Sequence, residues 1–327
     1  MAEAGEKSVR QLHLEASLLH LLDRFDQQPS SSGVSLREWL NTRPVEFCSL
    51  VGALLKQRAE HSPVRQFLAS LLAGFPDLPK ILSDPAAMSP SAASQLVAEI
   101  ARSDPTVDVK LTRWLLRGVG PSPDPVAAEP ARVIRLLDIL SGACCSSRAL
   151  VNLVQLLRHP DPKVRSKVTL LTGRVMKSAS WVESRMEDAD PRVRSNAIET
   201  LWRVEAPGVV DVLKKALRDS NNRVVGNALV GLCLSGDRTA VTLLEEMAGH
   251  ESSAFRATAA WAMGFLQDAT FIPVLGKLLK DPEAIVRRNA LRVLARIKRA
   301  TGQTLPASPA ETDPAESHRD DQPSEAV

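Results

Sequence analysis

Four arginines in the second half of this chain stand at the same place in a recurring sequence pattern, where they could together bind a phosphate or a carboxylate. They are Arg165, Arg194, Arg256 and Arg287. A guanidinium group donates two parallel hydrogen bonds to such anions. Aspartates recur nearby at Asp161, Asp190 and Asp281, and a carboxylate is an equally good partner. We therefore interpret the arginines as ion pairs between neighbouring repeats. Val225 takes the arginine's place in one copy and interrupts any continuous anion-binding stripe.

A second group of side chains has the composition of a protein-binding surface. Positions five and eight residues after the motif arginine lie roughly 120° to 180° around a helix from the preceding apolar residue, away from the hairpin core. Tryptophan and arginine are enriched among the residues that carry interface energy. Burial between adjacent repeats is the alternative explanation. The candidate partner-binding residues, with Arg288 one residue after the motif position, are Leu170, Glu199, Trp202, Val230, Trp261, Arg288 and Arg292.

The elements that must position these residues recur with a nearly constant period. The apolar residue before the motif position returns at intervals of 29, 31, 31 and 31 residues, at Val164, Val193, Val224, Phe255 and Val286. Such a period, with helical patterning inside it, is typical of a stacked-repeat solenoid. An aspartate followed by proline predicts a helix start at Asp161, Asp190 and Asp281, because the carboxylate caps the first turn. We predict an all-α fold, an α-solenoid of stacked antiparallel helical hairpins.

Residues at fixed distances from the motif position define the expected contacts between helices. Twelve residues before it stand Leu153, Val182, Leu213, Leu244 and Leu275, and three residues after it Val168, Ala197, Ala228, Ala259 and Ala290. Two further columns, eight before and ten after, are Leu157, Met186, Leu217, Ala248 and Leu279, and Val175, Val204, Ser235, Leu266 and Ile297. These columns predict the core. Hydrogen-bonding rungs are expected two residues after the motif position, at Asn196, Asn227 and Asn289.

The chain divides into four expected parts. Residues 1–120 form an N-terminal helical region, interpreted as degenerate repeats continuous with the array, with a separate helical domain as the alternative. Residues 121–147 hold a Pro-rich loop and a connecting helix, and residues 148–300 hold five repeats. Residues 301–327 carry six acidic residues against one basic, four prolines and no aromatic residue. This composition predicts a disordered acidic tail.

One repeat in particular resembles a known family. The segment from Thr270 to Ala290 reads TFIPVLGKLLKDPEAIVRRNA. It is similar to the short bacterial HEAT repeat, also called the phycobilisome-lyase-like HEAT repeat, and the resemblance covers about residues 148–297. It implies a HEAT/armadillo-like superhelix that acts as a protein-interaction scaffold, with the second helices lining the concave side. A fold of this kind hosts many functions and does not dictate one.

Enzymatic readings find little support in the sequence. Some HEAT-like deoxyhypusine hydroxylases bind two irons through repeated His-Glu pairs, but this chain has one such pair, His250–Glu251. A bilin lyase is suggested by the repeat's alternative name alone. The four cysteines lack metal-ligand spacing, and no Gly-rich phosphate loop or nucleophile elbow is present. We expect no catalytic residue, no cofactor and no metal site.

Nucleic acid is the alternative partner. The formal net charge is +3, and residues 148–300 contain 25 Lys or Arg against 16 Asp or Glu. The basic residues Arg287, Arg288, Arg292, Arg296, Lys298 and Arg299 would suit phosphates. They gather at one end, however, and the acidic tail would compete with DNA.

The sequence therefore favours a non-enzymatic scaffold or adaptor that binds a protein partner along the concave face. We expect a bacterial, cytoplasmic monomer, since no apolar segment approaches the length of a membrane span and the cysteines do not form a disulfide framework.

Overall fold

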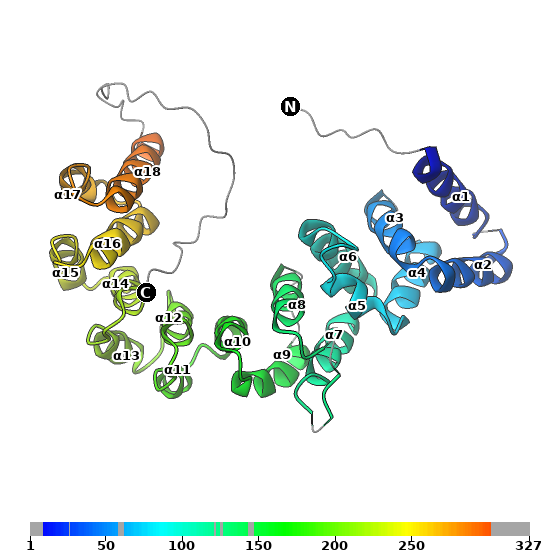
Figure 1. Ribbon diagram of the computed structural model, residues 1–327, viewed down its shortest axis with the longest axis horizontal. Helices are drawn as coiled ribbons and strands as arrows, with labels where there is room; N and C mark the ends of the chain where they lie inside the picture. The colour runs from blue at the N-terminus through cyan, green and yellow to red at the C-terminus, as the bar shows by residue number, and fades with distance from the viewer. Residues whose placement is uncertain are drawn as a thin grey trace. The chain divides into compact units, whose positions relative to one another are not determined.

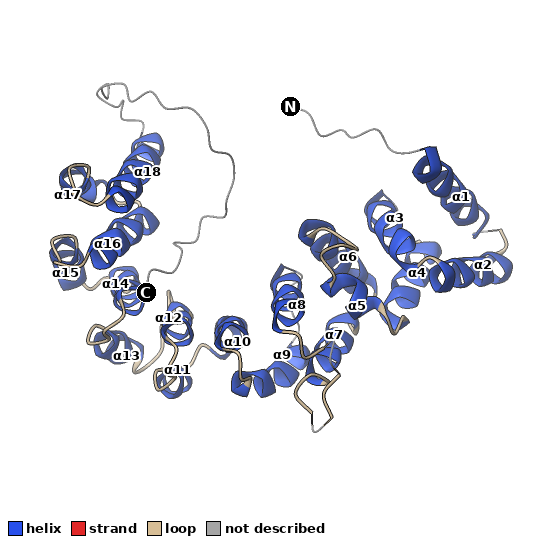
Figure 2. Cartoon of the chain, in the orientation of Figure 1, coloured by secondary structure: helices blue, strands red, loops and turns tan. Residues whose placement is uncertain are grey.

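The computed structural model describes residues 9–25, 27–57, 62–120, 122–124, 127–142 and 147–301. All regular elements in these ranges are helices, as the repeat pattern predicts, and no strand occurs among them (Figure 2). The predicted disordered tail lies, from residue 302 onward, outside the described residues. The chain forms two compact units, Met1–Leu244 and Glu245–Val327, called unit 1 and unit 2 below.

Unit 1 begins with seven helices. Their bounds are α1 Val9–Phe25, α2 Pro29–Thr42, α3 Pro44–Gln57, α4 Pro63–Gly74, α5 Leu78–Ser83, α6 Pro90–Ser103 and α7 Val107–Leu116. Four of them start with proline, whose ring fits the first helical turn and whose missing N–H is not needed there. Ser62 and Ser89 cap α4 and α6 by accepting hydrogen bonds from backbone N–H groups three residues later. Helices α3 and α4 both pack on α6.

A shorter connecting region follows. Helix α8 spans Pro130–Gly142, α9 spans Ser147–Leu153, and the 3-10 helix η1 spans Val154–Arg158. Helix α8 packs against α6 on one side and α10 on the other. The column residue Leu153 is fully buried at the end of α9, so the first repeat starts in this region.

The regular repeats of unit 1 form two layers of helices. The second helices are α10 Pro162–Met176, α12 Pro191–Glu199 and α14 Asn222–Leu234, which pack side by side in that order (Figure 1). The first helices α11 Ala179–Arg185 and α13 Val209–Ala216 lie beside each other in the other layer. Close approach between α10 and α12 requires glycine, because a methyl group at Gly173 would lie 2.6 Å from a carbon of Thr200.

Unit 2 contains the last hairpins. Helix α15, Thr239–Met247, contains the division between the units, and α16 Ser253–Leu266, η2 Ala269–Phe271, α17 Ile272–Leu278 and α18 Ala284–Thr301 follow. Helix α18 packs against both α16 and α17 (Figure 1). A methyl group at Gly264 would meet Val293, so these second helices are also in close contact.

The predicted core columns are largely confirmed. Every residue of the columns twelve before and three after the motif position is buried. The two outer columns are less regular, and three of their members were wrong: Val175 is 53% exposed, Leu279 is 37% exposed, and Ser235, the polar member, is exposed as well. Val175 lies in the last turn of α10, just before the chain leaves the helix at Lys177 with φ of 44°. Leu279 directly follows α17, the last first-layer helix of the described chain, so no further helix of that layer covers it.

Candidate interaction surface

The motif arginines form a ladder between successive hairpins, as predicted. Each of three guanidinium groups makes a two-pronged ion pair with an aspartate 23 to 25 residues later in the chain. The Nε–Oδ2 and Nη2–Oδ1 distances are 2.9 and 2.9 Å for Arg165–Asp188, 2.7 and 2.9 Å for Arg194–Asp219, and 2.6 and 2.9 Å for Arg256–Asp281. The remaining Nη1 donates to two backbone carbonyls of the loop before its own helix; for Arg194 these are Asp188 and Ala189.

Two of the predicted aspartate partners were wrong. Asp161 and Asp190 stand four residues before the motif arginine, where their side chains cap α10 and α12. The ladder partners stand six residues before it, as Asp188, Asp219 and Asp281 do. At this place the carboxylate also accepts a backbone N–H from two residues later, which fixes the loop. Asp281 was correct as a partner but caps no helix directly, since α18 begins at Ala284.

The ladder changes the ionisation of its members. The hydrogen bond from Arg165 holds the pKa of Asp188 below its ordinary value of 3.8, and Arg256 does the same for Asp281. Hydrogen bonding to the ionised form favours that form. Arg165, Arg194 and Arg256 are therefore occupied by the protein's own carboxylates and carbonyls. Arg287 repeats the carbonyl contacts, since its Nη1 donates to Asp281 and Pro282, but its predicted ion pair is not among the contacts of the described residues.

The asparagine rungs are confirmed. The side chain of Asn196 donates to the Ser166 carbonyl at 3.1 Å, and Asn227 donates to the Ser195 carbonyl at 3.0 Å. In unit 2, Asn289 reaches the carbonyl of Ala257 at 3.5 Å. Each bond joins one second helix to the one before it. These asparagines are structural.

The candidate partner-binding residues of unit 1 are mostly enclosed. Leu170 and Glu199 are partly buried. Val230 was wrong as a surface residue, because its side chain is fully buried. Every residue from Gly226 to Leu232 is buried, so this part of α14 is surrounded on all sides and offers no outward face.

Trp202 and Glu199 are brought together at the end of α12. Both line a shallow pocket with Arg174, and Arg174 approaches the Glu199 carboxylate to 3.5 Å. Burial raises the pKa of Glu199 despite this neighbour. The Trp202 indole N–H donates to the Asn227 carbonyl at 2.8 Å, and its ring packs near Gly231. Trp202 thus joins α12 to α14, and its polar group serves the fold.

Unit 2 presents the exposed members of the set. Trp261 on α16 is 39% exposed, and Arg288 and Arg292 on α18 are exposed. The contact of Asn289 with Ala257, and that of Val293 with Gly264, set the register of the two helices. Trp261 lies between Ala257 and Gly264 along α16, as Arg292 lies between Asn289 and Val293 along α18. Trp261 and Arg292 therefore both belong to the stretch over which α16 and α18 are in contact.

Sequence reasoning missed two members of this surface. Phe265, nine residues after the motif arginine of its repeat, is 41% exposed, and its ring lies 6.2 Å from that of Trp261. Arg296 holds the same place in the next repeat and is also exposed. A ninth-residue column in the alignment of repeats would have found both. We call Trp261, Phe265, Arg288, Arg292 and Arg296 the α16–α18 face.

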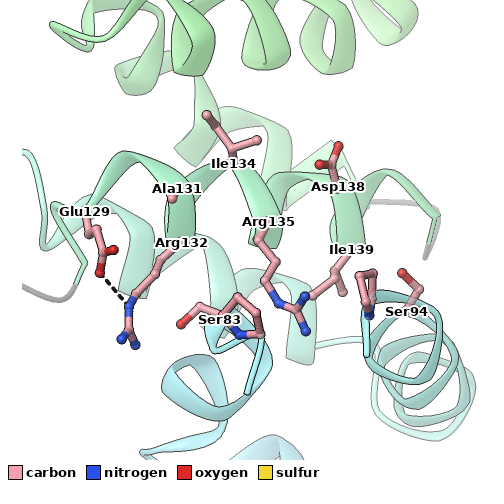
Figure 3. Close-up of a pocket in the computed structure, with 11 residues that line it drawn as sticks. Ser83, Ser94, Glu129, Ala131, Arg132, Ile134, Arg135, Asp138 and Ile139 are labelled. Carbon is pink, nitrogen blue, oxygen red and sulfur yellow. Dashed lines mark hydrogen bonds and ion pairs between the residues drawn. The ribbon is translucent and has the colours of Figure 1, made fainter. Parts of the chain in front are cut away.

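A second pocket in unit 1 lies beside α8. Figure 3 shows the Arg135 side chain extending from α8 between Ser83 and Ser94, which come from α5 and α6. Arg135 donates to the carbonyls of Leu82, at 2.7 Å, and Met88. At the pocket's edge Arg132 pairs with Glu129 at 2.6 Å (Figure 3). Arg135 thus joins α8 to α5 and to the segment after it, whereas the Arg132–Glu129 pair is a local contact at the start of α8.

The groups that suggested chemistry have structural partners. His250 accepts a backbone hydrogen bond from Ser252 at 3.0 Å and stacks on Phe255 at 4.3 Å, while its carbonyl and that of Glu251 accept from Arg256. Burial raises the pKa of the Cys48 thiol to about 12, which opposes a nucleophilic role.

Two further properties hold for the described part of the chain. It contains no group of three or more His, Cys, Asp or Glu side chains that could hold a metal ion. None of its helices is both long enough and apolar enough to cross a bilayer.

Comparison with known proteins identifies the repeats. Residues 150–233, 178–255 and 226–295 match the family model of HEAT repeats. Residues 150–295 are therefore HEAT repeats, and the fold is an α-solenoid. A crystal structure of an engineered protein, a target of the Northeast Structural Genomics Consortium, is similar at 16% sequence identity with a TM-score of 0.34, over 89% of this chain and 96% of that chain. No curated protein sequence matches the chain.

Proposed function

We propose, from the premise that residues 150–295 are HEAT repeats, that this chain is a non-enzymatic scaffold that binds a protein partner through the exposed side of its second helices. HEAT repeats in general mediate protein–protein interactions. The finer parts of the proposal are a partner held mainly by the α16–α18 face, and a cytoplasmic monomer that needs no cofactor.

The observation that carries the proposal is a contrast within the repeats: some side chains make the same contacts in successive repeats, whereas others are exposed in one place only. The ladder arginines and the asparagine rungs make the same contacts in successive repeats, so they maintain the stack. The α16–α18 face instead carries exposed aromatic and arginine side chains, the types that dominate interface hot spots. A preformed helical surface also loses little conformational entropy on binding.

Affinity capture with matched variants tests the proposal. The wild-type chain, a Trp261→Ala/Arg292→Ala variant and a Val34→Ala/Arg113→Ala control are used as bait in nuclease-treated and untreated lysate. Val34 is 66% exposed and Arg113 is exposed, and both lie in unit 1. We expect one protein to be captured by the wild type and by the control in both lysates. The amount captured by the Trp261→Ala/Arg292→Ala variant should be at least tenfold lower. Loss of all capture after nuclease treatment would instead assign the surface to nucleic acid.

A further inference from the structure

We propose that the α16–α18 face is the docking site of this chain's own C-terminal segment, residues 302–327, which covers the face until a partner displaces it. Such docking would regulate partner binding at the α16–α18 face, so the proposal rests on the proposed scaffold function. It draws on the charge of α18, the exposed aromatic pair beside it, and the residue types of the segment.

The charges of α18 and of the C-terminal segment are opposite. Helix α18 contains six basic residues and no acidic one. Arg288, Arg292 and Arg296 follow one another at intervals of four residues, so they form a single exposed row along the helix. The C-terminal segment carries its six acidic residues at Glu311, Asp313, Glu316, Asp320, Asp321 and Glu325 against the single basic Arg319. Opposite charges on a surface and on a covalently attached segment favour their association.

The exposed aromatic pair on α16 suits the prolines of the segment. Trp261 and Phe265 are neighbours on α16, the helix that packs against α18, and each is about two-fifths exposed. Near its start, the segment contains the sequence Pro306-Ala307-Ser308-Pro309. Segments with prolines three residues apart dock on exposed aromatic rings in a preformed extended conformation. The prolines of the segment thus suit the aromatic rings of the face, and its carboxylates suit the arginines.

The segment is long enough to reach the face. Arg292 lies nine residues before Thr301, or about 14 Å back along the helix axis. The five residues from Thr301 to Pro306 span at most about 17 Å when extended, so Pro306 can turn back to the level of Arg292. Glu311 is ten residues beyond Thr301 and can reach up to about 33 Å. Arg288, about 20 Å back along α18, is within that limit.

Covalent attachment makes this docking effective even if the contacts are weak. A short tether holds a segment near its site at an effective concentration of about 1 mM. If the free segment bound with a Kd of about 100 µM, the ratio of covered to uncovered face in the intact chain would be about ten. A partner must then compete with the segment, which raises the partner's apparent Kd by about the same factor.

The test uses full-length chains and a fluorescein-labelled peptide of residues 302–327. One variant neutralises the attached segment through Glu311→Gln, Asp313→Asn, Glu316→Gln, Asp320→Asn, Asp321→Asn and Glu325→Gln. Fluorescence anisotropy measures binding of the labelled peptide to this variant and to the wild type. We expect the neutralised chain to bind the peptide at least fivefold more tightly, because its own segment no longer competes.

Further changes in the neutralised chain assign the contacts. Arg288→Gln/Arg292→Gln/Arg296→Gln should abolish peptide binding, whereas the control triplet Lys110→Gln/Arg113→Gln/Arg117→Gln, three exposed basic residues at α7, should retain it. Trp261→Ala should weaken binding, and a peptide with Pro306→Ser and Pro309→Ser should show the same loss. Unchanged circular dichroism and thermal midpoints establish that each variant folds.

Three outcomes would overturn the proposal. Equal peptide affinity of the wild type and the neutralised chain would mean that the attached segment does not cover the face. An equal loss of peptide binding in the control triplet would mean that the peptide responds to the net charge of the chain and not to the α16–α18 face. Tighter binding of a fluorescein-labelled 20-nucleotide oligothymidine than of the peptide would assign the face to single-stranded nucleic acid. None of these results removes the scaffold function, which is decided by capture of a partner on the Trp261→Ala/Arg292→Ala variant.

Discussion

Two regions of unit 1 use an arginine after a helix-starting Pro-Val or Pro-x-Val sequence, but they place it in different surroundings. In the N-terminal region, Arg65 on α4 pairs with Glu99 on α6 at 2.8 Å, and both side chains are 4% exposed. Arg65 also donates to the Leu55 carbonyl at 2.7 Å. In the ladder, Arg194 pairs with Asp219 at 2.7 Å, with the side chains 15% and 9% exposed.

The difference teaches that one sequence motif can supply either a core ion pair or an edge rung. Arg65 crosses the space between two helices and is enclosed by them, whereas Arg194 runs along the loops at the edge of the layer and satisfies their carbonyls. A charge buried without its partner is far more costly than one that water can reach. The two pairs should therefore respond very differently to the loss of one member.

The largest effect is expected from Glu99→Gln. The change removes the carboxylate that pairs with the buried Arg65, and removing one partner of a buried ion pair destabilises folded proteins by about 3–5 kcal/mol. Urea unfolding followed by circular dichroism gives the free energy of unfolding. The double variant Arg65→Met/Glu99→Leu removes both charges and should recover most of the loss. If Glu99→Gln costs less than the ladder variant below, the contrast drawn between the two regions is wrong.

A smaller effect is expected from Arg194→Ala. It removes a charge-assisted pair to Asp219 and two bonds to loop carbonyls at a site that water partly reaches, so we expect a loss of about 1–2 kcal/mol. A double-mutant cycle with Asp219→Asn isolates the ion pair, whose coupling should be about 0.5–1.5 kcal/mol. Coupling near zero would mean that Arg194 acts through the carbonyls alone.

The ladder also predicts a pH dependence. The pKa of Asp188 is lowered by the hydrogen bond from Arg165, so the folded chain favours the ionised form. The resulting stabilisation is present above the ordinary aspartate pKa of 3.8 and is lost as the pH falls through the lower folded pKa. Asp188→Asn removes it. The difference in unfolding free energy between wild type and variant should be constant above about pH 5 and shrink below about pH 4, measured by urea titrations at each pH.

Most of the fold could be read from the sequence because its determinants are local and periodic. The valine and alanine columns repeat at fixed offsets, so helix spacing alone predicted their burial. The ladder partners were harder, since Asp188 and Asp190 are two residues apart and only the three-dimensional loop shows which one faces Arg165. Val230 was misplaced because helical phase gives the direction of a side chain but not what covers it. The exposed Phe265 was missed because it stands nine residues after the motif arginine, outside the positions five and eight residues after it.

The smallest effect is expected from Glu199→Gln, and it has the opposite sign to the ladder changes. Burial raises the pKa of Glu199 above its ordinary value of 4.5, so the folded chain favours the neutral form there. Stability therefore declines as the pH rises from that ordinary value through the raised one.

Glutamine mimics the neutral acid, so the variant should match the wild type below about pH 4 and exceed it at pH 7 by less than about 1 kcal/mol. Asp188→Asn, measured in parallel, supplies the opposite trend. If Glu199→Gln instead destabilises the chain at pH 7, the approach of Arg174 to this carboxylate outweighs burial, and the end of α12 carries another stabilising rung. A variant that is more stable but no longer captures the partner would show that Glu199 contributes to binding although it lowers the stability of the fold.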